Sequence, residues 1–145
     1  MSASPASLLK SKMLADMESE KNSQALKKAK LGVKKFPKDP DFWSMSGFIL
    51  QSEKHYKKAA QYFLGAAKLR PDDEKDVENL VYALEMSNQN PAAEKYLVKT
   101  IEKHPNNFLF TMLLGNFFAR GMRWHELIEF TTDCMSRFPA KIGLL

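Results

Sequence analysis

The sequence predicts an all-α fold, an α-solenoid of four helix–turn–helix repeats. The first observation is an internal period, because prolines recur at a constant interval of 34 residues, at Pro37, Pro71, Pro105 and Pro139. A period of this length is typical of repeats built from two helices. The second observation is that apolar residues follow one face of an α-helix in each half-repeat. The third is that proline and helix-capping residues separate these segments.

The first repeat spans about residues 4–37. Ser4 and Pro5 indicate a helix start, since serine caps the first turn and proline loses nothing there by lacking an N–H group. We expect this helix to end near Glu20 and Asn22 to cap the next one. Apolar residues on one face of that second helix are Ala25, Leu26, Ala29, Gly32, Val33 and Phe36.

The second repeat, about residues 38–71, is the best copy of the pattern. Gly47 on its first helix and Ala59 on its second are small, so we expect the two helices to cross closely where these residues meet. The close crossing would let the rings of Trp43 and Phe63 interlock.

The third and fourth repeats, about residues 72–105 and 106–139, keep the same period. Asp72 and Asp73 can cap the first helix of the third repeat. Gly121 is a typical helix stop inside the fourth repeat.

The C-terminal end departs from the pattern. Leu127 stands where the other three repeats have alanine, so we expect a slightly wider helix crossing there. Residues 140–145 would form the start of a further helix or a tail. No polar capping helix follows, and this predicts exposed apolar surface. We hypothesise that the chain is part of a longer protein, or that it self-associates through this uncapped repeat.

The best copy also matches a known repeat. Its matching positions are Trp43, Gly47, Ala59, Phe63 and Pro71. This spacing resembles the tetratricopeptide repeat, with Ser46 and Leu50 in place of its leucine and tyrosine. The resemblance covers about residues 4–139 and implies a right-handed α-solenoid that forms a single domain over residues 1–145.

In that family the first helix of each repeat lines a concave groove. Side chains that packing leaves over on those helices predict a groove of mixed aromatic, methionine and amide character, suited to an extended or helical peptide. The predicted groove residues are Asp41, Met45, Phe48, Lys75, Asn79, Tyr82, Leu109, Met112, Leu113 and Asn116. Alternatively, Met45 and Phe48 simply pack against the first hairpin.

Some members of the family grip the acidic C-terminal tail of a chaperone with paired lysine and amide side chains, an arrangement called the carboxylate clamp. Here Lys10 and Lys75 match two positions of the clamp. The positions that depart from it are Leu14, Met45, Phe48 and Asn79. The resemblance therefore disfavours binding of a chaperone tail.

Motifs for catalysis or cofactor binding are missing from the sequence, which has no phosphate-binding loop, HExxH, nucleophile elbow or CxxC. We therefore expect no enzyme activity, no cofactor and no small-molecule substrate. The three histidines lie too far apart in sequence to form a metal site. The single cysteine, Cys134, aligns with small buried positions of the other repeats, and we interpret it as a packed core thiol.

Charge and hydropathy limit the partners further. Residues 1–72 hold 14 basic and 7 acidic side chains, whereas residues 73–145 hold 8 and 10. We interpret the lysines of the first half as a solvated helix face. No run approaches the ~20 apolar residues of a membrane span, and the N-terminus lacks the apolar core of a signal peptide. The lone cysteine fits a reducing compartment, so we expect a cytoplasmic protein.

These observations predict a non-enzymatic scaffold that binds a protein or peptide segment in the groove, as one portion of a larger protein or complex. A second reading is a module that regulates or positions a catalytic domain, such as a transferase. A third is an RNA-binding helical-repeat protein, but the recurrent base-reading polar pair of pentatricopeptide proteins does not occur here, which disfavours nucleic acid. The identity of the partner is not encoded in any motif.

Overall fold

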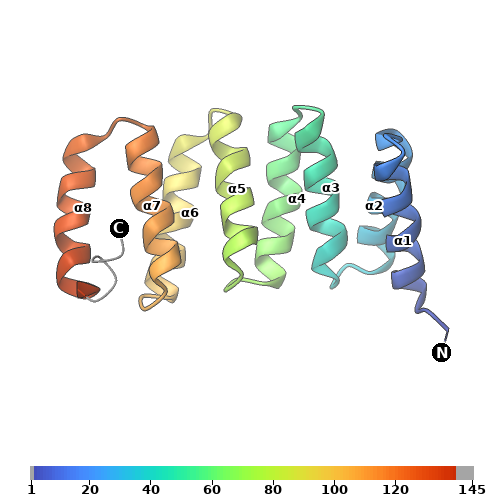
Figure 1. Cartoon of the computed structure of the whole chain (residues 1–145), viewed down its shortest axis with the longest axis horizontal. Coiled ribbons are helices and arrows are strands. Elements are labelled where there is room, and N and C mark those ends of the chain that lie inside the picture. Colours follow the sequence, from blue (N-terminus) through green and yellow to red (C-terminus); the bar gives the residue numbers. More distant parts are fainter. Residues whose placement is uncertain (1, 140–145) are drawn as a thin grey trace. The chain divides into compact units, whose positions relative to one another are not determined.

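The computed structural model describes residues 2–139, and every regular element in them is an α-helix (Figure 1). The helices are α1 Pro5–Glu18, α2 Asn22–Lys35, α3 Pro40–Ser52, α4 Tyr56–Leu69, α5 Glu74–Met86, α6 Asn90–Lys103, α7 Phe108–Arg120 and α8 Trp124–Arg137. The all-α prediction is confirmed. The predicted start of a further helix or tail, residues 140–145, lies outside the described residues.

Two compact units divide the chain, Met1–Gln89 and Asn90–Leu145. In the first unit, each helix from α1 to α4 packs on the helix that follows it. In the second unit, α6 packs on α7 and α7 packs on α8. Neighbours in sequence are therefore neighbours in space within each unit, as expected for a helical repeat. The single-domain reading of residues 1–145 stays a prediction.

Side-chain caps begin the first helix of each repeat. The capping residues of α1, α3, α5 and α7 are Ser4, Asp39, Asp73 and Asn107. Their side-chain oxygens accept backbone N–H groups at distances between 3.0 and 3.2 Å. Such caps satisfy N–H groups that have no partner inside the helix. The predicted helix starts at Ser4 and Asp73 are confirmed.

The prediction that Asn22 caps α2 is wrong. Asn22 is the first residue of the helix, and the N-cap residue is Lys21, whose side chain makes no capping hydrogen bond. The backbone of the turn replaces the cap. The Lys21 N–H donates to the carbonyl of Asp16 at 2.8 Å, and the Lys21 carbonyl accepts from the N–H of Ala25 at 2.9 Å.

The turn inside each hairpin repeats with the sequence period. One residue per turn has a left-handed backbone, and these residues are Glu20, Lys54, Asn88 and Met122, with φ between 55° and 62°. None of them is glycine, although glycine adopts this conformation at least cost. Gly121 is the C-cap of α7, as predicted, but its φ is −79°. The left-handed residue is the one that follows it.

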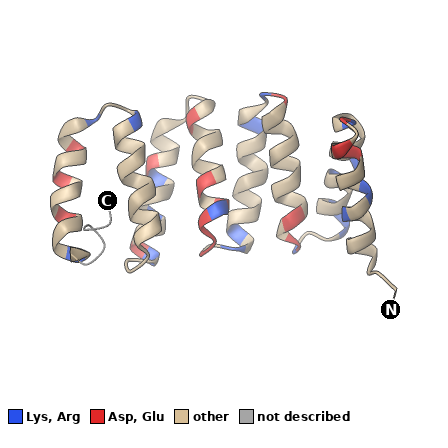
Figure 2. Cartoon of the chain, in the orientation of Figure 1, with Lys and Arg blue, Asp and Glu red and all other residues tan. Residues whose placement is uncertain are grey.

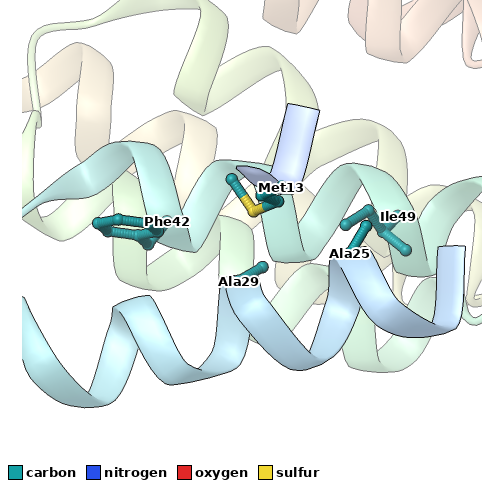
Figure 3. Close-up of a cluster of buried hydrophobic side chains, with 5 residues drawn as sticks. All are labelled: Met13, Ala25, Ala29, Phe42 and Ile49. Atoms are coloured by element: carbon teal, nitrogen blue, oxygen red, sulfur yellow. The ribbon is translucent and has the colours of Figure 1, made fainter. Parts of the chain in front are cut away.

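A buried apolar cluster joins the first hairpin to α3 (Figure 3). Its members are Met13, Ala25, Ala29, Phe42 and Ile49, none of them more than 1% exposed. Ile49 therefore packs between the first hairpin and the second repeat. Phe42 fits because Gly32 has no side chain, and a Cβ atom at that glycine would overlap the phenyl ring. The ring also stacks on Phe36, with 5.7 Å between ring centroids.

The packing of Trp43 differs from the prediction. Gly47 receives the ring of Phe63 as expected, since a Cβ atom at Gly47 would lie 2.6 Å from a ring carbon. Trp43, however, lies over Gly65 of α4, where a Cβ atom would overlap the indole. Gly65 is therefore a small residue that admits the indole, a role that the sequence did not predict for it.

Candidate functional site

A surface depression of about 690 Å³ lies in the first unit, where α1, α3 and α5 meet the end of α4. Its lining residues are Lys10, Leu14, Asp41, Ser44, Met45, Phe48, Arg70, Asp73, Lys75, Asp76 and Asn79. We call this depression the first-unit groove. It brings together five predicted groove residues, namely Asp41, Met45, Phe48, Lys75 and Asn79. Tyr82 follows on α5, three residues after Asn79.

An ion pair forms part of the groove lining. The Arg70 Nε atom donates to one carboxylate oxygen of Asp76 at 2.7 Å, and Nη2 donates to the other at 3.0 Å. Nη2 also donates to the Ser44 hydroxyl at 3.2 Å. The hydrogen bonds to Asp76 raise the pKa of Arg70 above its ordinary value, so the guanidinium keeps its charge. Figure 2 shows basic and acidic residues together at these ends of α4 and α5.

Sequence reasoning missed this ion pair, although the period holds a signal for it. One period earlier and one period later in the chain, the positions equivalent to Arg70 and Asp76 are occupied by pairs of residues with aromatic rings. The equivalent pairs are Phe36 with Phe42 and His104 with Phe110, whose ring centroids lie 5.7 and 5.6 Å apart. An acidic residue at a position that is aromatic and buried in other repeats needs a buried partner.

A second set of ion pairs lies at the start of α3. The Lys10 ammonium is 2.7 Å from a carboxylate oxygen of Asp39 and 2.7 Å from one of Asp41. Burial by itself lowers the pKa of Lys10, but the hydrogen bonds to the two aspartates outweigh burial and raise that pKa. The Lys10 ammonium is therefore protonated, and Asp39 and Asp41 balance its charge.

Three large apolar side chains, Leu14, Phe48 and Tyr82, follow the period along α1, α3 and α5. We call them the apolar row. Their exposed fractions are 46%, 42% and 45%, although each helix also has fully buried positions. Phe48 contacts Phe63 edge-on with 5.2 Å between centroids, and Tyr82 contacts Tyr56 in the same way at 6.3 Å. Both aromatic rings are thus supported from behind and open to solvent.

Met45 differs from Phe48. It is half-buried and packs against the cluster that joins the first hairpin to α3. The alternative interpretation, packing against the first hairpin, therefore describes Met45. Phe48 packs instead on Phe63 of its own hairpin.

The other four predicted groove residues lie on α7 in the second unit, and three of them line one of two depressions. Leu109 lines one that follows the end of α6. Met112 and Asn116 line the other, an apolar pocket of about 270 Å³ between α7 and α8. Leu113 is half-buried on α7 and lines neither of these two. All four stay predictions as partner-binding residues.

Cys134 also lines the pocket between α7 and α8 and is almost fully buried. Burial raises the pKa of its thiol, so the thiol is neutral at physiological pH. The side chains of Ile128 and Met135 on α8 are exposed. Self-association through this end of the chain stays a prediction.

Residues 2–139 contain neither a metal-binding cluster nor a membrane-spanning helix. No cluster of histidine, cysteine or acidic side chains in this range could hold a metal ion. None of the described helices combines the length and the apolar character that crossing a membrane requires.

Several solved structures are similar to this chain. MamA (residues 41 to the end) of Desulfovibrio magneticus RS-1 is 20% identical with a TM-score of 0.67, and the match covers 97% of this chain and 80% of that one. The first TPR domain of Spaghetti (RPAP3), bound to the HSP90 peptide SRMEEVD, is 20% identical with a TM-score of 0.63, covering 81% and 93%. This chain has the tetratricopeptide repeat fold. The resemblance inferred from the sequence is thus confirmed for the fold.

A third similar structure is the type III secretion chaperone SycD of Yersinia enterocolitica in complex with a peptide of the translocator YopD. It is 16% identical with a TM-score of 0.65, and the match covers 83% of this chain and 97% of that one. No protein-family model and no curated protein matches the sequence.

The two lysines that match the carboxylate clamp both line the first-unit groove. Lys10 is held by two aspartates, and Lys75 lies 3.2 Å from a carboxylate oxygen of Glu78. Either lysine would have to leave an internal ion pair before it could bind the carboxylate of a partner. The Lys75 pair is exposed and therefore weak, whereas the Lys10 pairs are more shielded.

Proposed function

We propose that this tetratricopeptide chain is a scaffold that binds a segment of another protein in the first-unit groove. The observation that carries the proposal is the apolar row. Leu14 and Phe48 line the groove, Tyr82 follows on α5, and each of the three is more than 40% exposed. Large apolar side chains that gather at a depression are typical of protein-interaction sites.

Two of the similar structures support the proposal. The RPAP3 domain holds an HSP90 peptide, and SycD holds a peptide of YopD. Both show that this fold can present a surface for a short segment of another protein. The chemistry of the segment that binds here has to follow from the residues of this chain.

The groove offers two kinds of contact. Phe48 and Tyr82 can pack against apolar side chains of the partner, and each buried aromatic anchor contributes about 2 kcal/mol to binding. The amide of Asn79 is half-buried and makes no hydrogen bond within the described residues. An amide can both donate and accept, so it suits the backbone of a bound segment.

The test is a double variant, Phe48→Ala with Tyr82→Ala. A partner is first recovered by affinity capture on the wild-type chain, and its binding segment is then titrated in solution. Loss of about 2 kcal/mol for even one anchor weakens binding about thirtyfold, so we expect at least that change in Kd.

A matched control is the double variant Leu31→Ala with Leu69→Ala. These two leucines are 41% and 38% exposed, on α2 and α4, and they do not line the groove. We expect this control to bind with the wild-type Kd. A folded groove variant that keeps the wild-type Kd would refute the proposal, and so would a control variant that weakens binding equally.

A further inference from the structure

The formal charges of the first-unit groove cancel. The charged residues that line it are Lys10, Arg70 and Lys75 on the basic side and Asp41, Asp73 and Asp76 on the acidic side. With three charges of each sign, the groove has no net charge to attract an acidic or a basic segment from a distance. Selection has to come from direct contacts.

The strongest cations of the groove are already bound to carboxylates of this chain. Arg70 donates two hydrogen bonds to Asp76, and Lys10 lies 2.7 Å from Asp39 and from Asp41. To bind Arg70 or Lys10, a carboxylate of another protein would have to displace an aspartate of this chain that the fold holds in place. The internal carboxylate has the higher effective concentration, so the competition favours the closed ion pairs.

Apart from the exposed Lys75 ammonium, which pairs only weakly with Glu78, the contacts that remain open are uncharged. They are the apolar row and the amide of Asn79, which has no hydrogen-bond partner within residues 2–139. The aromatic rings of Phe48 and Tyr82 add polarisable surface without charge. This combination matches the backbone and the apolar side chains of a segment, and the exposed Lys75 is the one cation of the lining that an acidic side chain could reach without breaking a shielded ion pair.

We infer that the first-unit groove selects an uncharged segment with large apolar side chains and rejects acidic tails. The inference rests on the proposed function, because it assigns the chemistry of the ligand to the same groove. Leu14 and Phe48 are its specificity residues, since they line the groove with exposed apolar surface and carry no hydrogen-bond donor in their side chains. Binding of the selected segments depends little on salt, because no net charge is neutralised.

The experiment uses the whole chain and a display library of random short peptides, selected in parallel at low and at high salt. Enriched peptides are synthesised with blocked ends, and their affinity is measured by fluorescence anisotropy for the wild-type chain and for Leu14→Ala with Phe48→Ala. The peptide SRMEEVD, which the RPAP3 domain binds, serves as the acidic probe. We expect the enriched peptides to be uncharged and apolar, and to bind the variant at least about tenfold more weakly than the wild-type chain. We expect SRMEEVD to bind the wild-type chain more weakly than the enriched peptides do.

A second variant, Asp39→Asn with Asp41→Asn, releases Lys10 from its ion pairs. Asparagine also caps helices, so α3 keeps an N-cap residue at position 39. We expect this variant to bind SRMEEVD more tightly than the wild-type chain does, and at low salt above all.

The outcomes separate the two proposals. Enriched peptides that are acidic, and whose affinity falls in the Leu14 and Phe48 variant, would overturn the inference and leave the groove assignment standing. Enriched peptides that bind the variant and the wild-type chain equally would overturn the proposed function itself. A failure to enrich any peptide would count against both.

Discussion

The ion pair between Arg70 and Asp76 occupies the place that a pair of aromatic residues holds one period earlier in the chain. Its contribution to stability can be measured directly. The perturbation is Arg70→Ala, which removes two hydrogen bonds to Asp76, one to Ser44 and a longer one to Asp41. The carboxylate of Asp76 is only 3% exposed when Arg70 is present, so it depends on the guanidinium for its compensating charge. The substitution leaves a buried charge with a single side-chain donor, the Ser44 hydroxyl at 3.3 Å.

The expected cost follows from burial. Removing one partner of a fully buried ion pair costs about 3–5 kcal/mol. The Arg70 side chain is 36% exposed, so solvent already weakens the pair, and Ser44 still donates to Asp76 after the substitution. We therefore expect the free energy of unfolding to fall by about 2–3 kcal/mol.

A rescue variant tests the equivalence of the repeats. In the first repeat the same two positions are Phe36 and Phe42, and Phe42 needs Gly32 beneath it. Copying that arrangement requires Arg70→Phe, Asp76→Phe and Ala66→Gly together, because Ala66 stands at the position of Gly32. Apolar residues that replace a buried ion pair at similar volume are often neutral or stabilising. We expect the triple variant to recover most of the stability that Arg70→Ala loses.

Urea denaturation followed by circular dichroism at the helical band measures both effects, with the slope of the transition as a check on the surface exposed. A loss below about 0.5 kcal/mol in Arg70→Ala would refute the reasoning, since surface substitutions commonly fall in that range. A triple variant as unstable as the single one would refute the equivalence of the three pairs.

Two further predictions concern packing and pH. Gly65→Ala should lower the free energy of unfolding by about 1–3 kcal/mol and alter the fluorescence of Trp43, because the added Cβ atom would overlap the indole. The control is Gly121→Ala, whose Cβ atom would meet its nearest neighbour at 3.5 Å, and this variant should be neutral or slightly stabilising. Burial raises the pKa of Cys134 above its ordinary value of 9.0 and that of Tyr62 above 10.0, so the folded chain keeps protons that the unfolded chain loses. The urea midpoint should therefore be constant from neutral pH to about pH 9 and fall above it; a midpoint that rises between pH 9 and pH 10.5 would contradict this sign.

The sequence by itself determined the helices and their period. Hydrogen bonds between residues close in sequence form the helix starts at Ser4 and Asp73 and the turns between helices. Such local signals can be read from the sequence alone. The recurrence of proline at 34 residues indicated the number of repeats, because each repeat buries its apolar face on the next. The assignment of a groove to the first helices came from the resemblance to the tetratricopeptide repeat, and five of the ten predicted positions line the first-unit groove.

Only the tertiary structure decided which of those side chains remain open. Met45 and Phe48 read alike in sequence, yet Met45 packs against the first hairpin and Phe48 stays 42% exposed. The pairing of Arg70 with Asp76 and the place of Trp43 over Gly65 also depend on neighbouring helices. Periodicity determines the face of a helix on which a residue lies, but exposure and pairing are set by side chains that other segments bring to that face.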